Sequence, residues 1–234
     1  MRISDVFFPS NFKCMFCGVE VQGIGICDDC NNKLPYISER KCVKCGGEVG
    51  GDGKVCIECK KWERLFNRCF CIFNYVDEVQ NKILQFKNAG AKYLGYAFAQ
   101  IIDKKFRDLD IEYDIIIPVP ISKERMKARK FNQSEILCES LERNTGKVIK
   151  DLLYRLKDTP HQKGLGRVNR IKNLRNAFAI KDKSLIANKV IVIVDDIFTT
   201  GTTLNECARV LRENGASGVY GLCLARTPVK EVVH

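Results

Sequence analysis

The sequence lacks any run of about 18 apolar residues, the length that a helix needs to cross a bilayer, so we expect no membrane insertion. The first residues, MRISDVFFPSNFKC, contain no long apolar segment of the secretory type, which predicts a cytoplasmic protein. Histidine is scarce, and neither His161 nor His234 is spaced to share a metal with another ligand. A Gly-Lys-Ser/Thr loop is also absent, which argues against a Walker-type nucleotide site.

Cysteine, in contrast, is abundant, and eight of the 13 cysteines form four C-x-x-C pairs. A reducing cytoplasm disfavours a disulfide framework, whereas two such pairs folded together supply the four thiolates of a tetrahedral zinc site. The spacing therefore predicts two structural Zn²⁺ ions in preference to redox or disulfide roles. Joining consecutive pairs needs only short hairpins and is favoured over an interleaved arrangement, although the spacing leaves both open. The expected ligands are Cys14, Cys17, Cys27, Cys30, Cys42, Cys45, Cys56 and Cys59.

The other five cysteines lack this spacing. Cys69 and Cys71 lie on one face of an expected strand, and Cys138, Cys207 and Cys223 fall in helix or strand patterns. Because free cysteine usually behaves as a small apolar residue, we expect these five in the core.

Two domains are predicted. Residues 1–66 have many cysteines and few core positions, so we expect this domain to need metal to fold. Residues 67–234 alternate strands with helices, which is typical of a parallel α/β sheet. Asp77 is expected to cap one helix, and Asn132 with Glu135 resembles a capping box for another. The expected strands are 69–75, 113–119, 148–153, 178–180, 190–194 and 219–225. Helices are expected at 77–88, 91–106 and 132–144, and a last helix contains Leu204, Ala208 and Leu211 and ends at Asn214.

The stretch 190–211, VIVIVDDIFTTGTTLNECARVL, is the centre of the second domain. Its β-branched run predicts a central strand that is apolar on both faces, and two acids, a Thr/Gly turn and a helix follow. Gly201 and the unpaired N–H groups of the helix start suit a phosphate. Asp195 and Asp196 suit vicinal hydroxyls or hydrated Mg²⁺. Phosphoribosyl pyrophosphate (PRPP) offers all these groups, although a threonine-capped helix after a core strand is the simpler interpretation.

This stretch resembles the PRPP-binding motif of type I phosphoribosyltransferases, in which two acids and two variable residues precede Thr-Thr-Gly-x-Thr. The resemblance implies a parallel sheet of order 3-2-1-4-5, counted from the strand at 113–119. It also implies Mg²⁺ bound together with PRPP, and a catalytic role for Asp195 and Asp196. The implied PRPP-binding residues are Asp195, Asp196, Thr199, Thr200, Gly201, Thr202 and Thr203.

Two further segments, IPVPISKERMKARKFNQSEIL and RLKDTPHQKGLGRVNRIKNLRNAF, resemble those of the ComF family. The four C-x-x-C pairs resemble its double zinc ribbon, and Lys130 stands where that family usually has glycine. The resemblance implies a role in natural competence and DNA uptake, in handling single-stranded DNA in the cytoplasm beside partners such as a ComF-type helicase. An active phosphoribosyltransferase that uses PRPP and Mg²⁺ on an unidentified acceptor is the alternative.

Positive charge is concentrated in residues 123–175, where 15 basic and 6 acidic side chains give a net charge of +9 out of +11 for the whole chain. Such a segment suits nucleic-acid phosphates, with Trp62, Phe131 and Tyr154 available for base stacking. Two other uses stay open: a solvated face, and a mobile loop at 157–175 that neutralises pyrophosphate. The candidate DNA-binding residues are Arg125, Lys127, Arg129, Lys130, Arg167, Arg170 and Arg175.

Overall fold

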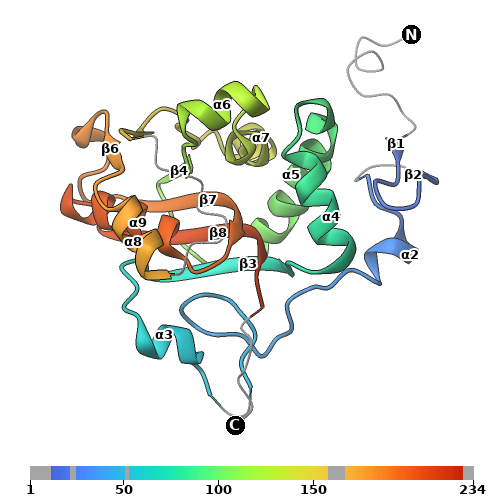
Figure 1. The fold of residues 1–234 in the computed structure, drawn as a ribbon, viewed down its shortest axis with the longest axis horizontal. Coiled ribbons are helices and arrows are strands. Elements are labelled where there is room, and N and C mark those ends of the chain that lie inside the picture. Colours follow the sequence, from blue (N-terminus) through green and yellow to red (C-terminus); the bar gives the residue numbers. More distant parts are fainter. Residues whose placement is uncertain (1–11, 22–24, 51–52, 158–166, 229–234) are drawn as a thin grey trace.

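A four-stranded sheet forms the centre of the protein (Figure 1). The computed structural model describes residues 12–21, 25–50, 53–157 and 167–228. All neighbouring strands of this sheet are parallel, in the order β3-β8-β7-β4. The strands are β3 (Arg68–Asn74), β8 (Gly218–Arg226), β7 (Val190–Phe198) and β4 (Ile115–Pro118). The expected α/β class with a parallel sheet is therefore confirmed.

The predicted strand order holds on one side of the sheet. The strands expected at 113–119, 190–194 and 219–225 are β4, β7 and β8, and they are adjacent in that order. The strand expected at 69–75, for which no position was predicted, is β3 and pairs with β8. Beyond β4, Val148 forms an isolated parallel bridge with Ile116. The strand expected at 148–153 therefore pairs with β4 at one residue only.

The predicted neighbours also hold beyond β4, but the direction of the last pair and its place in the main sheet are wrong. β5 (Leu153–Arg155) and β6 (Phe178–Ile180) form a separate two-stranded antiparallel sheet. A parallel pair needs a crossover layer between its strands. The described part of this connection contains only one short helix, α8 (Arg167–Leu174), and it packs on α9 (Thr202–Glu213). The polar segment between β5 and β6 therefore brings the chain back in the opposite direction.

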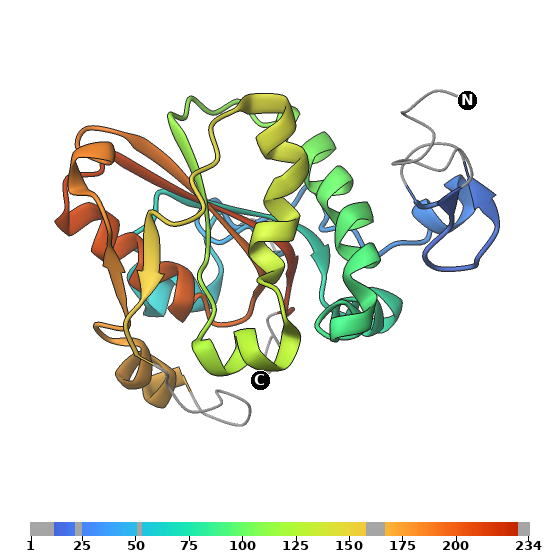
Figure 2. The same cartoon turned by 90° about the horizontal axis from the view of Figure 1, so that it is seen from above.

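Two cores cover the two faces of the sheet, which explains why the apolar run of β7 is unbroken. Val192 and Val194 pack with residues of α4 (Asp77–Phe86), α5 (Lys92–Arg107) and α7 (Gln133–Thr145). Ile191 and Ile193 pack with residues of α9 and with Cys42, Cys45 and Cys56. Figure 2 shows the green and yellow helices on one side of the sheet and the red α9 on the other.

The cysteine-rich part has little regular structure. It contains the antiparallel pair β1 (Phe12–Lys13) and β2 (Glu20–Val21), and two short helices, α2 (Asp28–Asn31) and α3 (Ile57–Lys61). Short 3₁₀ turns, η1 (Ala89–Ala91) and η2 (Lys183–Leu185), complete the elements of the described chain. No helix in these described ranges has both the length and the apolar character needed to cross a membrane.

Helix caps follow the sequence signals in one case and not in another. Asn132 caps α7 as predicted, because its Oδ1 accepts from the Ser134 amide at 3.0 Å and its Nδ2 donates to Glu135 at 3.1 Å. The predicted cap by Asp77 is wrong, since Val76 occupies the N-cap position of α4 and no side chain caps that helix. The Val76 carbonyl already accepts from the Gln80 amide, so Asp77 lies inside the first turn.

The basic segment after β4 forms a helix, α6 (Lys123–Arg129), with Ser122 as its N-cap. Lys130 ends this helix in the left-handed region at φ 67°, and its amide donates to the Met126 carbonyl at 2.8 Å. Left-handed backbone favours glycine, because a Cβ makes it less stable by about 1–2 kcal/mol. The turn expected of a glycine at this position therefore forms with lysine in its place.

Replacing Lys130 with glycine is expected to raise the free energy of unfolding by about 1 kcal/mol. The change removes the steric cost of the left-handed conformation, offset in part by the larger freedom of glycine in the unfolded chain. Calorimetric melting of the two proteins measures the difference. Lys127→Gly, inside α6, is the control and should lower stability by about 1 kcal/mol; a destabilised Lys130→Gly protein would contradict the assignment of strain.

Candidate functional site

The acidic pair lies near the carboxyl end of β7, which extends further than predicted, to Phe198. One Asp195 oxygen, Oδ1, accepts from the Asp196 amide at 2.8 Å and from the Ser134 hydroxyl at 3.3 Å. Lys87, at the end of α4, forms an ion pair with Asp196 through Nζ and Oδ2 at 2.9 Å. The two carboxylates are thus held by groups from α7 and from the connection between α4 and α5.

The two carboxyl groups have different proton affinities. Burial, assisted by the neighbouring Asp196 charge, raises the pKa of Asp195 to about 7. Burial also acts against ionisation of Asp196, but the charges of Lys87 and Arg129 hold the pKa of this carboxyl below its ordinary value. Near neutral pH the site therefore contains one ionised carboxylate that faces cations and a second that exchanges its proton.

The Thr/Gly turn connects β7 to α9, with Gly201 at the N-cap and Thr202 as the first helical residue. Gly201 has φ 73°, and a Cβ there would lie 2.3 Å from the Phe198 ring, so the turn requires glycine. The hydroxyl oxygens of Thr200 and Thr202 are 2.8 Å apart. The first amides of α9 lack intrahelical acceptors and lie at the positive end of its dipole. Backbone and hydroxyl donors at this turn can therefore hold a phosphate.

Arg64 connects this turn to the cysteine-rich part. One guanidinium nitrogen, Nη1, donates to the Thr200 carbonyl at 2.9 Å, and Nε donates to the Cys59 sulfur at 3.3 Å. The neighbouring Leu65 amide donates to the Asn205 side chain of α9 at 2.8 Å. We call residues 199–203 the phosphate-type turn. Arg64, which also contacts a predicted zinc ligand, therefore holds this turn in place through the Thr200 carbonyl.

The eight predicted zinc ligands form two separate groups, each with all four sulfur atoms within 4.8 Å of one another. Consecutive C-x-x-C pairs share a group, as the sequence favoured. Two sulfur–sulfur distances, 3.6 Å for Cys17–Cys27 and 3.5 Å for Cys45–Cys56, are close to the ~3.8 Å edge of a tetrahedral ZnS₄ site with 2.3 Å bonds. The donor set and its spacing therefore fit structural zinc.

Hydrogen bonds to the sulfur atoms support the same fit, because ligands of a metal site are usually held by donors around them. The Cys30 amide donates to the Cys27 sulfur at 3.4 Å, and the Cys56 amide donates to the Cys42 sulfur at 3.3 Å. In the second group, Arg226 also donates from Nη2 to the Cys45 sulfur at 3.1 Å. A zinc tetrathiolate has a charge of −2, which Arg64 and Arg226 would balance in the second group.

The candidate DNA-binding residues separate into two environments. Lys127 and Lys130 are exposed and Arg125 is half-buried on α6. Arg129 turns the other way: it donates to the Gln133 side chain at 2.8 Å and lies within electrostatic reach of both acids. Arg175 is exposed beyond the end of α8.

Part of the basic segment is not described. Arg167 and Arg170 fall on α8, and their side chains are outside the described structure. Residues 158–166, the centre of the loop predicted to be mobile, are also outside it. The expectation that Phe131 is available for stacking is wrong, because Phe131 is 9% exposed and stacks on Phe86 with ring centroids 5.7 Å apart. Tyr154, at 43% exposure, is accessible.

Two family models match this chain. The description "Phosphoribosyl transferase domain" matches residues 90–234, and "Double zinc ribbon domain" matches residues 3–71. The first match covers more than half of the sequence, so the chain belongs to the phosphoribosyl transferase domain family. The second agrees with the two four-cysteine groups.

Among curated proteins, the chain is 29% identical over 232 residues to Competence protein F of Haemophilus influenzae, an alignment that covers 92% of this chain and 97% of the relative. It is 29% identical over 210 residues to the DNA utilization protein YhgH of Escherichia coli, with 87% and 91% covered. It is 28% identical over 211 residues to Competence protein ComFC of Bacillus subtilis, with 86% and 84% covered. The resemblance to the ComF family is confirmed.

Sequence reasoning missed three side chains of the site: Lys87, Ser134 and Arg64. Each reaches the acids or the turn from an element distant in sequence, and Lys87 and Arg64 lie in no local motif. The capping box at Asn132 fixes the start of α7 and thereby the position of Ser134, which is the one signal that could have placed any of them.

Proposed function

We propose that this chain is a cytoplasmic ComF-like protein of DNA uptake that binds PRPP with Mg²⁺ and handles single-stranded DNA. The observation that carries the proposal is that an acidic pair and a glycine-dependent phosphate-type turn lie at the same end of β7. Similarity to proteins named for competence and DNA utilization supports the DNA role. Other DNA-uptake proteins, such as a ComF-type helicase, are the partners that this role implies.

In this proposal the 5′-phosphate of PRPP binds at residues 199–203 and the start of α9, and its ribose hydroxyls donate to Asp195 and Asp196. Because Lys87 is only 2.9 Å from Asp196, the ribose hydroxyls must share this carboxylate with the lysine or displace it. Mg²⁺ would neutralise the pyrophosphate group. Arg129, beside both acids, is then a candidate contact for pyrophosphate rather than for DNA.

Titration calorimetry with PRPP and Mg²⁺ tests the proposal. The double variant Asp195→Ala plus Asp196→Ala is expected to weaken binding at least about a hundredfold, because it removes two carboxyl acceptors, one of which is ionised near neutral pH. Asp110→Ala plus Asp151→Ala is the matched control, since it removes two exposed carboxylates and should leave binding unchanged. The absence of PRPP binding by the intact protein would exclude the proposed site.

Membership of the phosphoribosyl transferase domain family favours one other function, the transfer of a phosphoribosyl group to an acceptor. In that reaction cations and Mg²⁺ would stabilise the departing pyrophosphate. Pyrophosphate release from PRPP that depends on an added acceptor would establish the enzyme function. PRPP binding without such release would favour the binding role.

PRPP binding should depend on pH through Asp195. Its folded-state pKa of about 7 means that the carboxyl gains a full acceptor charge only as the pH rises through neutrality. We expect affinity to increase between pH 6 and 8 in calorimetry, by roughly up to tenfold per pH unit where the group titrates. In Asp195→Asn, the pH dependence of affinity that comes from Asp195 should be lost, and the pH dependence that comes from the phosphates of PRPP should remain. Identical pH profiles for the two proteins would contradict the assignment.

A further inference from the structure

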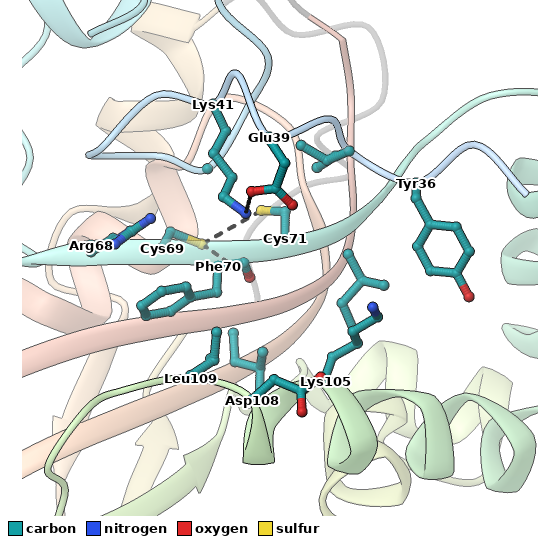
Figure 3. Close-up of a pocket in the computed structure, with 14 residues that line it drawn as sticks. Tyr36, Glu39, Lys41, Arg68, Cys69, Phe70, Cys71, Lys105, Asp108 and Leu109 are labelled. Carbon is teal, nitrogen blue, oxygen red and sulfur yellow. Dashed lines mark hydrogen bonds and ion pairs between the residues drawn. The ribbon is translucent and has the colours of Figure 1, made fainter. Parts of the chain in front are cut away.

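Three cysteines outside the zinc ribbons form a third cluster. Cys69 and Cys71 of β3 and Cys223 of β8 have their sulfur atoms within 4.8 Å of one another. Alternation along β3 places its two cysteines on one face, and the parallel register sets Cys71 opposite Cys223. Figure 3 shows the Cys69 and Cys71 sulfurs next to each other above β3. The sequence predicted these residues in the core but did not predict that they meet.

The distances in this cluster match those of metal-bound thiolates. The Cys69 sulfur lies 3.7 Å from that of Cys71 and 3.8 Å from that of Cys223. Sulfur atoms bound at about 2.3 Å to one tetrahedral ion lie ~3.8 Å apart. Neutral thiols that pack together in a core reach similar separations. The charged groups around the sulfurs are therefore needed to distinguish metal-bound thiolates from packed thiols.

A buried cation lies beside the cluster. Arg226 is 3% exposed, and its Nε is buried with no hydrogen-bond partner among the described residues. Its Nη2 donates to the sulfur of the ribbon ligand Cys45 at 3.1 Å, and the Cys71 sulfur lies 3.6 Å from the Cys45 carbonyl oxygen, so the guanidinium lies where the second ribbon adjoins this cluster. Nη2 and Nη1 are used by Cys45 and by the Thr227 carbonyl, so the buried Nε proton is the one that remains without a partner in the described part of the chain, a cost that a nearby thiolate would offset better than a neutral thiol.

A cavity of about 450 Å³ borders Cys69 and Cys71 (Figure 3). Its lining contains three cationic side chains, Lys41, Arg68 and Lys105, against two carboxylates, Glu39 and Asp108. Three thiolates with one Zn²⁺ have a net charge of −1, which this excess of one positive charge would balance. The cavity adjoins the part of β3 that carries Cys69 and Cys71, of which Cys71 is partly exposed and Cys69 is fully buried.

We propose that Cys69, Cys71 and Cys223 form a third metal site, which binds a thiophilic d¹⁰ ion, Zn²⁺ or Cu⁺, through three thiolates. No histidine or carboxylate joins this cluster among the described residues, and an all-sulfur donor set selects soft ions over Mg²⁺, Ca²⁺ or Mn²⁺. Three protein ligands leave a fourth position open on Zn²⁺. The site is therefore chemically distinct from the two closed four-cysteine centres.

Cadmium NMR on the intact protein, loaded with Cd²⁺ under anaerobic reducing conditions, tests the proposal. We expect two resonances of CdS₄ type from the ribbons and a third of CdS₃ type. Two resonances alone at excess Cd²⁺ would overturn it. Separate loading with Zn²⁺ and with Cu⁺, each followed by elemental analysis, identifies the ion. A third bound equivalent of Zn²⁺ or of Cu⁺ per chain shows which metal the site takes. If the protein binds a third equivalent of neither metal, the proposal is contradicted.

Cys71→Ser is expected to reduce bound metal by one ion per chain and to remove only the CdS₃ resonance. The two remaining ribbon resonances show that the variant has folded. Cys138→Ser is the matched control, because Cys138 is fully buried and belongs to none of the three clusters; it should keep three ions. Equal metal contents in wild type and Cys71→Ser would assign the cluster to core packing.

Discussion

Cys59→Ser is expected to weaken PRPP binding about ten- to a hundredfold, although Cys59 is outside the proposed PRPP site. Its sulfur accepts from Arg64, and the same guanidinium donates to the Thr200 carbonyl in the phosphate-type turn. The −2 charge of a zinc tetrathiolate would hold Arg64 in this position. Loss of the ion releases the guanidinium, and a hydrogen bond to a charged group contributes about 1.5–3 kcal/mol.

The first ribbon provides a matched control for this effect. Cys17→Ser removes a ligand of the first group, which lies on the opposite side of the molecule from α9 (Figures 1 and 2). Both variants should lose one zinc by elemental analysis, but Cys17→Ser should keep PRPP affinity within about twofold. Arg64→Ala should keep both zinc ions and still weaken binding. Equal PRPP affinities for the Cys17 and Cys59 variants would show that the second ribbon does not support the turn.

The features that the sequence predicts well are those fixed by neighbours along the chain. The apolar run at 190–194, the glycine at 201 and the helical spacing that follows predict β7, the turn and α9 in the observed order, although β7 continues beyond the predicted end to Phe198. The predicted strand at 178–180 is β6. Pairing of consecutive C-x-x-C knuckles follows from the short hairpins between them. In each case the residues that form the feature are close in sequence.

The features that the sequence does not predict depend on contacts between distant segments. Lys87 meets Asp196, and Arg64 meets Thr200 across 136 positions; no spacing rule connects either pair. The third cysteine cluster depends on the register of β3 against β8, which hydrophobic alternation alone does not set. The antiparallel pairing of β5 with β6 was missed because short strands pair in either direction, and the expected order came from a resemblance.

Single-stranded DNA binding should be strongly salt dependent and should rely on α6. Engagement of about four phosphates gives a slope of log K against log salt near −3, at roughly −0.7 per phosphate. The triple variant Arg125→Ala, Lys127→Ala, Lys130→Ala is expected to flatten this slope to about −1 and to weaken binding most at low salt. Fluorescence anisotropy of a labelled single strand over a range of KCl concentrations measures both quantities, and zinc content should not change.

Two controls separate DNA binding from the proposed PRPP site. Arg129→Ala should leave the DNA slope unchanged and weaken PRPP, since Arg129 faces the acidic pair. Lys104→Ala, Lys181→Ala, Lys183→Ala removes three exposed cations elsewhere and should retain the wild-type slope, because only positions that neutralise DNA phosphates release counterions. If both triple variants flatten the slope equally, DNA binding depends on the total positive charge of the protein and not on the cations of α6. A wild-type affinity that is independent of salt would favour the enzyme function and leave the basic residues to pyrophosphate and solvent.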